Sequence, residues 1–427
     1  MSSDRRSLRR VVAASLVGTA IEWYDFFLYG TAAALVFPRL FFPASEPLVG
    51  TMLAFGTYAL GFIARPIGGV IFGHFGDRIG RKKLLMLSLV LMGIATFAIG
   101  LLPTYTQIGV WAPVLLVGLR LVQGFAVGGE WGGAVLLVAE HGPRARRGFW
   151  ASWPQVGVPI GNLLAAALLA VMSALQTEQA FFAWGWRVPF LLSAGLIVIG
   201  YWVRVAVAET PVFEAARRTE RLPVLEVLRH HQRSLAVGMG LRLAENVSYY
   251  IFTVFSITYI TEVVGLSRTV ALNAVLVACV AHAFALPAFA ALSDRIGRRP
   301  VYAFGAIGVA VWGFAFFRLL DTGATPAIIA AFAIGLVLHA AMYGPQAAFI
   351  AELFPTHVRY SGASFAYQVT SIFAGSLAPI IAIALLRRSE SARPISLYLL
   401  VTCVLTALAA FAARETKSRS FDEIDTV

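Results

Sequence analysis

Twelve long apolar stretches run along this 427-residue chain, and they limit its possible folds more than any other feature. Each stretch is about as long as the 20 or so residues that a helix needs to cross the hydrocarbon core of a bilayer. They leave no segment large enough for a soluble domain, so we predict an all-α membrane protein. The predicted spans are residues 11–37, 48–73, 84–103, 111–140, 149–175, 185–207, 235–261, 270–292, 301–320, 326–351, 362–386 and 394–413.

The composition agrees with a membrane protein. Hydrophobic residues make up 59% of the chain and charged residues 13%, a balance far outside that of soluble domains. The two cysteines, Cys279 and Cys403, both fall inside predicted spans. We therefore expect no disulfide framework, no metal cluster and no cofactor.

Arginine and lysine are distributed unevenly between the two ends of the predicted helices. A net charge of +12 would suggest a nucleic-acid partner for a soluble protein, but orientation explains it better here, because cytoplasmic loops are rich in Lys and Arg. We predict a multi-pass plasma-membrane protein with both termini in the cytoplasm, in contact with lipid and not with nucleic acid. With that orientation, the outside segments hold only Arg39, Arg187, Arg268, Arg318, Arg387, Arg388 and Arg393.

A short motif occurs twice and divides the chain into two halves. The sequence DRIGR begins at Asp77, after the second span, and again at Asp294, after the eighth. We predict two pseudo-symmetric six-helix bundles, residues 1–207 and 234–427, joined by a cytoplasmic linker at 208–233. Such internal repetition places a substrate site near the middle of the membrane, between the halves.

Two acids interrupt the first span. Glu22 and Asp25 lie roughly 11 to 14 residues into it, which is near mid-membrane at about 1.5 Å per residue. A charge there costs about 2.5 to 3.5 kcal/mol, so both side chains, three positions apart and on one helix face, must face the bundle or a water-filled cavity. Desolvated or closely spaced carboxylates take up protons more readily. We predict proton coupling here, and the alternative is a permanent salt bridge.

Two arginines lie equally deep. Arg120 is in the fourth span, and Arg242 is in the seventh with Glu245 three residues later. Arginine stays protonated, so each needs a counter-charge, for which Asp25, Glu22, Glu130, Glu245 and a substrate carboxylate are the candidates. We predict that Arg120 shares a charge network with Asp25 and that Arg242 binds a substrate anion; an intrahelical pair with Glu245 is the alternative for Arg242.

Further polar residues inside the spans complete the predicted sites. Glu130 stands among glycines that indicate close helix packing, and we place it with the proton-coupling residues. Amides, phenols and an imidazole on several spans would suit a hydroxylated ligand. The predicted substrate-binding set is Arg242, Glu245, Arg120, Tyr24, Gln155, Asn162, Tyr249, His339, Tyr343, Gln346, Tyr367 and Gln368.

The chain lacks the motifs of an ATP-driven pump or an enzyme. None of its three lysines, Lys82, Lys83 and Lys417, follows a glycine, so it has no phosphate-binding loop. It also has neither a nucleophile elbow nor a metal-spaced His/Glu pair on a helix. We therefore predict a gradient-driven transporter and not an enzyme; a channel is disfavoured because two repeats suit the rocking of two halves.

Several motifs carry a family resemblance. GHFGDRIGRKK (73–83) resembles the loop motif of the major facilitator superfamily, and RLVQG (120–124) resembles that superfamily's motif in the fourth span. Four further motifs resemble the metabolite:proton symporter branch: EWYDFFLYG, QGFAVGGEWGGA, WGWRVPF and ELFPTHVRYSG. Within that branch, the chain resembles the bacterial shikimate permeases through GHFGDRIGRKK, APVLLVGLRLVQGFAVGGEWGG and the WGWR stretch. The resemblance covers nearly the whole chain.

The resemblance implies a transport cycle and a gate. We expect proton-coupled uptake of a small organic acid, such as shikimate or a related hydroxylated carboxylate, by a monomer. The alternatives are a dicarboxylate such as 2-oxoglutarate or citrate, or a zwitterionic osmolyte such as proline or betaine. In the family the repeated loop motif locks the inner gate while the outside is open. The corresponding residues here are Gly73, Asp77, Arg78, Gly80, Arg81, Asp294, Arg295 and Arg298.

Overall fold

The computed structural model of the chain describes residues 2–79, 81–128, 138, 143–206 and 223–417. Within these residues every regular element is helical and no strand occurs. Among the described residues, twelve long helical segments fall on the twelve predicted spans, which confirms the predicted all-α architecture; residues 129–137 and 139–140 of the fourth predicted span lie outside the described part. The segments of the first half are α1 (Ser2–Leu35), α3 (Pro47–Ile79), α4 (Arg81–Leu101), α6 (Trp111–Val127), α8 (Arg147–Leu175) and α10 (Arg187–Ala206).

The second half contains the other six segments, two of which are interrupted by π-helical turns. One runs from α13 (Gln232–Tyr250) through η4 (Ile251–Phe255) and α14 (Ser256–Thr258) to η5 (Tyr259–Val263), and the other from α18 (Arg359–Thr370) through η6 (Ser371–Ser376) to α19 (Ala378–Ser389). Such turns are frequent at functional sites. The uninterrupted helices are α15 (Arg268–Ile296), α16 (Arg298–Asp321), α17 (Thr325–Ala351) and α20 (Arg393–Ala412).

Short helical pieces connect these segments. Of the predicted linker at 208–233, residues 208–222 lie outside the described part of the chain, and the remainder forms α12 (Pro223–His230) and the start of α13. The other pieces are α2 (Phe37–Phe41), α5 (Tyr105–Ile108), η1 (Arg144–Arg146), α9 (Glu178–Ala180) and η2 (Phe181–Gly185).

Seven of the described helices are long and apolar enough to cross a membrane, or eight if the bent pair formed by Glu178–Gly185 and Arg187–Gly200 is one span. Met86–Leu101 and Trp111–Val127 are shorter apolar helices. The two long helices left over, α1 and α13, are those that contain the predicted intramembrane charges. Because those charged side chains are buried in the bundle, they lower the hydropathy of α1 and α13 without exposing charge to lipid.

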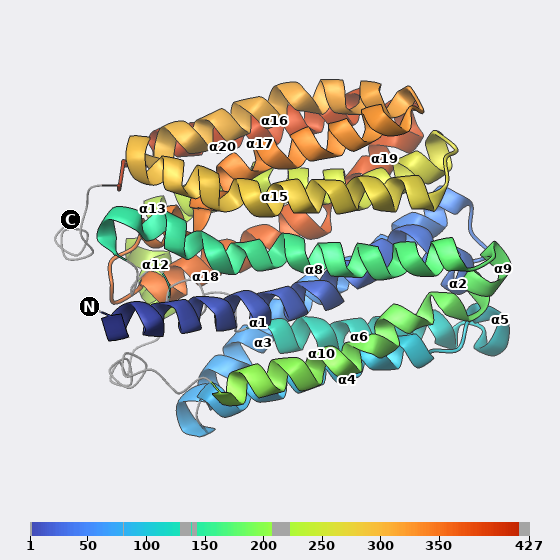
Figure 1. Cartoon of the computed structure of the whole chain (residues 1–427), viewed down its shortest axis with the longest axis horizontal. Helices are drawn as coiled ribbons and strands as arrows, with labels where there is room; N and C mark the ends of the chain where they lie inside the picture. The colour runs from blue at the N-terminus through green and yellow to red at the C-terminus, as the bar shows by residue number, and fades with distance from the viewer. Residues whose placement is uncertain (1, 80, 129–137, 139–142, 207–222, 418–427) are drawn as a thin grey trace.

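The helices lie side by side along the longest axis of the molecule (Figure 1). α1 packs along α8, and α8 packs in turn along α15, so these three helices join the two halves. Small residues allow this close approach: a side chain added at Gly161 of α8 would place its first carbon 2.6 Å from the carbonyl oxygen of Ala20 in α1. α1 begins and α20 ends at the same end of the bundle (Figure 1).

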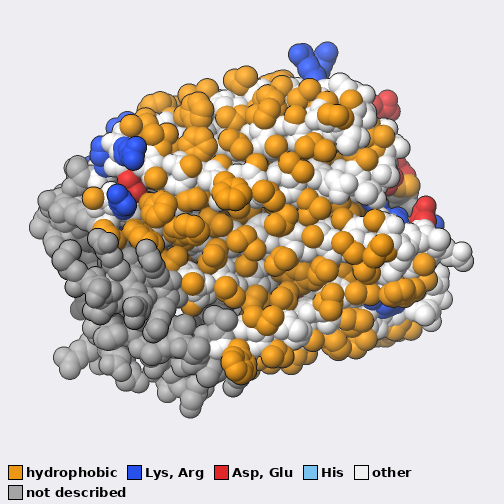
Figure 2. All heavy atoms as spheres, viewed as in Figure 1, with side chains coloured by type: hydrophobic (Ala, Val, Ile, Leu, Met, Phe, Trp, Pro, Cys, Tyr) orange, Lys and Arg blue, Asp and Glu red, His pale blue; other side chains and the backbone are white. Residues whose placement is uncertain are grey.

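The two copies of the repeated motif occupy equivalent places in the fold. α3 ends at Ile79 and α4 begins at Arg81, while α15 ends at Ile296 and α16 begins at Arg298. Each motif therefore lies where one long helix ends and the next begins. The face of the molecule shown in Figure 2 is apolar along most of its length, with charged side chains gathered near its two ends, as expected of a surface that contacts lipid.

Candidate functional site

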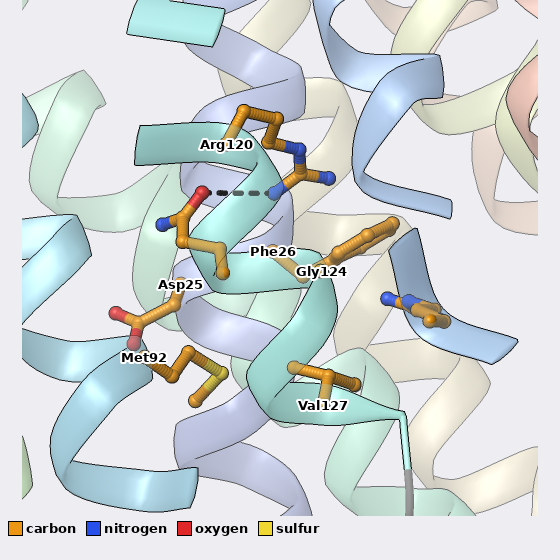
Figure 3. A pocket seen from close by; sticks show the side chains of 8 residues that line it. Asp25, Phe26, Met92, Arg120, Gly124 and Val127 are labelled. Atoms are coloured by element: carbon orange, nitrogen blue, oxygen red, sulfur yellow. Dashed lines mark hydrogen bonds between the residues drawn. The ribbon is translucent and has the colours of Figure 1, made fainter. Parts of the chain in front are cut away.

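A small pocket between helices of the first half contains the predicted proton-coupling acid. Its lining comes from α1, α3, α4 and α6, and Figure 3 shows the Asp25 carboxylate and the Arg120 guanidinium on its wall. Both side chains are almost fully buried, Asp25 at 3% and Arg120 at 2% exposure. The lining residues are Asp25, Phe26, Arg65, Met92, Arg120, Gln123, Gly124 and Val127.

Asp25 and Arg120 share the pocket without forming an ion pair. Arg120 instead donates from Nη1 to Gln123 Oε1 (3.1 Å) and from Nε to the carbonyl of Tyr58 (3.4 Å). Its Nη2 and the Oδ1 of Asp25 have no hydrogen-bond partner among the described residues. The predicted network of Arg120 with Asp25 therefore contains no direct ion pair in this structure, and Asp25 is a buried carboxylate without an ion-paired cation among the described residues.

Aromatic rings, and not a carboxylate, surround the guanidinium of Arg120 in the described structure. Its guanidinium carbon lies 4.4 to 4.7 Å from the ring centroids of Phe26, Tyr29 and Tyr58. Arg65 is held similarly, 4.4 Å from the Phe26 ring centroid. Desolvated contacts of this kind stabilise a cation by about 2 kcal/mol or more. Of the other predicted proton-coupling residues, Glu22 is 8% exposed on the same helix as Asp25, and Glu130 lies outside the described residues.

The second half contains a compact cluster around Arg242. The guanidinium donates from Nη1 to Glu245 Oε2 (2.7 Å) and Gln346 Oε1 (2.9 Å), and from Nη2 to Ser371 Oγ (3.3 Å). It also lies on the Tyr367 ring, 3.2 Å from the centroid. The predicted alternative for Arg242, an ion pair within its own helix, is thus formed in this structure.

Glu245 extends the cluster into a chain of imidazoles. Its Oε2 accepts from Gln346 Nε2 (3.1 Å), and its Oε1 lies 3.4 Å from His339 Nε2. His339 Nδ1 is 2.9 Å from His282 Nε2. Three helices, α13, α15 and α17, therefore contribute titratable side chains to one buried row.

Hydrogen bonds from α8 join the two halves near this cluster. Gln155 Nε2 donates to the carbonyl of Tyr343, and Asn162 Nδ2 donates to the Tyr249 hydroxyl at 3.2 Å. The Tyr249 ring packs against the rings of Phe27 in α1 and His339 in α17, with centroid-to-centroid distances of 5.4 Å and 5.2 Å. These predicted binding residues are thus brought together at the interface between the halves.

Three predicted binding residues are not brought into the cluster, and the first of them, Arg120, lies in the pocket of the first half. The Tyr24 hydroxyl donates to the carbonyl of Pro189 in α10 (2.6 Å), so this side chain fastens two helices of the first half to each other. Gln368 follows Tyr367, but it is half-buried, and its amide oxygen has no hydrogen-bond partner in the part of the chain that the structure describes.

An ionic network closes one end of the interface. The Asp294 carboxylate accepts from the backbone N–H groups of Gly148 (2.9 Å) and Phe149 (2.8 Å) at the start of α8. Arg298 pairs with Asp294 (2.7 Å) and with Glu352 (3.4 Å). Arg147 of α8 also pairs with Glu352 (3.0 Å). These contacts tie the first half to the second through buried side chains.

The other members of the predicted gate motif lie outside this network or outside the described part of the chain. Arg295 is exposed and takes no part in the ionic network. Gly80 lies outside the described residues. Gly73, Asp77, Arg78 and Arg81 lie in α3 and α4, but their side chains are outside the described part, so the first copy of the motif stays a prediction.

The opposite end of the interface is also bridged. Arg387 of α19 pairs with Glu46 (2.9 Å), and Arg268 Nε donates to Ser173 Oγ of α8 (2.7 Å). Arg39 and Glu178, both of the first half, form an exposed pair at 2.6 Å, and the hydrogen bond from Arg39 holds the pKa of Glu178 below its usual range. The two halves therefore contact each other at both ends and in the centre.

Sequence reasoning missed several members of these clusters. Arg65, Gln123 and Ser371 contact the pocket or Arg242, yet none was placed in a site. His282, which lies inside the eighth predicted span, was also not placed in a site. A signal existed for Arg65, which is a charged residue inside the second span, whereas Ser371 is an ordinary residue of a membrane helix until its contact with Arg242 is seen.

The model of the Major Facilitator Superfamily matches residues 15–379 and, separately, residues 243–424. The chain is 42% identical to the inner membrane metabolite transport protein YhjE of Escherichia coli (strain K12), over 97% of this chain and 96% of that protein. It is also 42% identical to the shikimate transporter of the same organism, over 96% and 95%. The chain therefore belongs to the Major Facilitator Superfamily, a family of multi-pass membrane transporters and not of enzymes.

Two further comparisons are informative. The proline/betaine transporter of Escherichia coli (strain K12) is 34% identical over 97% of this chain and 85% of that protein. The solved structure of the proton:xylose symporter XylE bound to 6-bromo-6-deoxy-D-glucose matches with a TM-score of 0.78 at 16% identity, covering 99% of both chains. That likeness confirms the predicted fold.

Proposed function

We propose that this transporter is a proton-coupled symporter that takes up a small organic acid, with shikimate or a related hydroxylated carboxylate as its substrate. In this proposal it works as a monomer in the plasma membrane with both termini in the cytoplasm. The two halves rock about a central site, so that the site faces first one side of the membrane and then the other.

The observation that carries the substrate class is the buried guanidinium of Arg242, 3% exposed and near the interface between the halves. Its planar fork matches the two oxygens of a carboxylate. In this structure the Glu245 carboxylate occupies one arm of that fork. A substrate carboxylate would take the place of Glu245 at Arg242, and the nearby amides and hydroxyls of Gln346, Ser371 and Asn162 would bind its hydroxyl groups.

The observation that supports proton coupling is that Asp25 is buried and has no ion-pair partner among the described residues. A buried acid that gains and loses a proton as its surroundings change can carry that proton across the membrane. Arg120 and Arg65 stand in the same pocket, so a small displacement of either toward Asp25 would favour proton release.

The ionic network around Asp294 is the proposed inner gate. Replacing Asp294 with asparagine removes its charge and one of the two acceptors that hold the start of α8. Hydrogen bonds to charged groups contribute about 1.5 to 3 kcal/mol, so we expect the closed state to lose stability by about tenfold or more. Cys279, which is 1% exposed and lies beside Tyr249, should then react faster with a permeant maleimide.

This measurement uses a Cys403→Ser background, in which Cys279 is the remaining cysteine of the two. Arg295→Gln is the matched control, because Arg295 belongs to the same motif but is exposed and should leave the alkylation rate unchanged. An unchanged rate in the Asp294→Asn protein would show that this network does not hold the gate.

The function itself is tested in right-side-out membrane vesicles with radiolabelled shikimate, 2-oxoglutarate and proline at two external pH values. We expect shikimate to accumulate, and to accumulate more strongly at the lower pH. Uptake that does not depend on an imposed proton gradient would exclude symport. Proton-driven uptake of 2-oxoglutarate or proline, without uptake of shikimate, would show that the proposed substrate is wrong.

A second candidate function is proton-coupled uptake of a zwitterionic osmolyte. It is supported by the 34% identity to the proline/betaine transporter and by the pairing of Arg242 with Glu245, which could bind the carboxylate and the cation of one zwitterion separately. The same vesicle experiment separates the two candidates, because proline uptake without shikimate uptake would favour the osmolyte.

A further inference from the structure

Two histidines and a glutamate meet at the end of the bundle where α1 begins and α20 ends. Glu226 lies in α12, His231 directly follows α12, and His357 lies in the connection between α17 and α18 (Figure 1). One ligand atom from each lies within 4.8 Å of the others. His357 Nε2 and Glu226 Oε1 are 3.0 Å apart although the residues are 131 positions apart in the chain.

The backbones that present these side chains are held by packing. Val227 is fully buried in a hydrophobic cluster with Ile350, Phe354 and Val358, which anchors α12 against the end of α17 and the following connection. The backbone N–H of His231 donates to the carbonyl of Val227 at 3.0 Å. The three side chains are therefore placed by the fold and not by one mobile surface segment.

The ligand set has a definite preference. Two imidazole nitrogens and one carboxylate suit zinc and similar transition-metal ions, which accept three protein ligands and one water in a tetrahedral site. Calcium takes six to eight oxygen ligands and magnesium an octahedron rich in oxygen, and one carboxylate does not supply these. The exposed side chains of His357 (56%) and Glu226 (40%) leave the cluster open to an ion from solution.

We propose that Glu226, His231 and His357 form a binding site for a divalent transition-metal ion of the zinc class, and that the bound ion fastens α12 to the connection between α17 and α18. The site is separate from the central charge clusters. It is connected to the Arg242 cluster through two helices, because α12 leads into α13, which contains Arg242, and α17 contains Gln346. α12 belongs to the predicted linker between the halves at 208–233, so a bound ion should fix the end of that linker to the second half and slow the rocking of the halves.

The site is tested first by binding alone. The full chain, purified without a polyhistidine tag, is titrated with zinc chloride against a chromophoric zinc indicator. We expect one bound zinc ion per chain, and loss of that ion in the His357→Ala protein. His230→Ala is the matched control, because His230 is the exposed neighbour of His231 and is not part of the cluster. Equal zinc binding by the His357→Ala protein, or equal loss in the His230→Ala protein, would overturn the site.

The effect of the bound ion on transport is tested by measuring substrate uptake in inside-out vesicles, first without zinc, then with zinc, and then after a chelator is added. Zinc should lower the transport rate of the wild type severalfold, the chelator should restore it, and the His231→Ala and His357→Ala proteins should not respond. Zinc binding with an unaltered transport rate would leave the metal site in place and exclude the fastening.

Discussion

Replacing Asp25 with asparagine is expected to abolish uphill accumulation of substrate while substrate exchange across the membrane continues. Asparagine has nearly the same size and can keep the neighbouring contacts, but it cannot take up a proton. The wild-type carboxylate is 3% exposed and has no ion-pair partner among the described residues, so the neutral amide should be tolerated there and folding should be little affected. Only the coupling should be lost.

The experiment measures two quantities in the same vesicles. Accumulation under an imposed proton gradient should fall to the equilibrium level, and counterflow with labelled substrate on both sides should stay within a few fold of wild type. Uptake by the wild type should also decrease as the external pH rises, whereas residual uptake by the variant should not depend on pH. Wild-type accumulation in the Asp25→Asn protein would remove Asp25 from the proton path.

Two further variants complete this test. Glu178→Gln removes an exposed acid that pairs only with Arg39 in the described structure, and it should leave accumulation and its pH dependence intact. Glu22→Gln decides which acid of α1 carries the proton, because loss of accumulation there, with Asp25→Asn behaving as wild type, would transfer the role to Glu22. A loss in both variants would indicate that the two acids act as one unit.

The architecture could be predicted from the sequence because it depends on long, repeated signals. Twelve apolar stretches predicted the helical segments, whereas the direction of the spans, predicted from arginine, and the division into two bundles, predicted from the repeated motif, stay predictions. The same local reasoning located the charges at 25, 120, 242 and 245. It also offered the pair of Arg242 with Glu245 within one helix, as the alternative for Arg242, because residues three positions apart share a helix face.

What the sequence could not supply is the choice of partners between distant helices. Arg120 was expected to meet a carboxylate, but the structure surrounds it with the rings of Phe26, Tyr29 and Tyr58. Tyr24 was expected in the binding site, but its hydroxyl contacts α10. Rotation of a helix by a few tens of degrees decides such contacts, and an apolar membrane helix carries little periodicity from which that rotation could be predicted.

The interhelical cluster at Glu226 was missed for a different reason. Metal sites are recognised in sequence by short, regular spacing of their ligands. Here the two histidines belong to separate connections, which the hydrophobic cluster around Val227 holds together. No local pattern could have joined them.

Replacing Arg242 with lysine is expected to raise the KM for an organic acid by about tenfold or more. Lysine keeps the positive charge that balances Glu245, so the buried pair and the fold should survive. It loses the planar fork that now reaches Glu245, Gln346 and Ser371 together. A carboxylate held at two points then becomes held at one, and one charge-assisted hydrogen bond contributes about 1.5 to 3 kcal/mol.

Two comparisons test this prediction: shikimate against proline as substrates, and a matched lysine variant at an exposed arginine. The KM for shikimate should rise more than the KM for proline, because the cationic group of a zwitterion can still pair with Glu245. Arg387→Lys makes the same exchange in an exposed pair with Glu46 and should change neither KM. Equal weakening of both substrates in the Arg242→Lys protein would remove Arg242 from the binding site and leave it as the structural partner of Glu245. A rise in shikimate affinity in Glu245→Gln would show directly that Glu245 competes with the substrate carboxylate for the guanidinium.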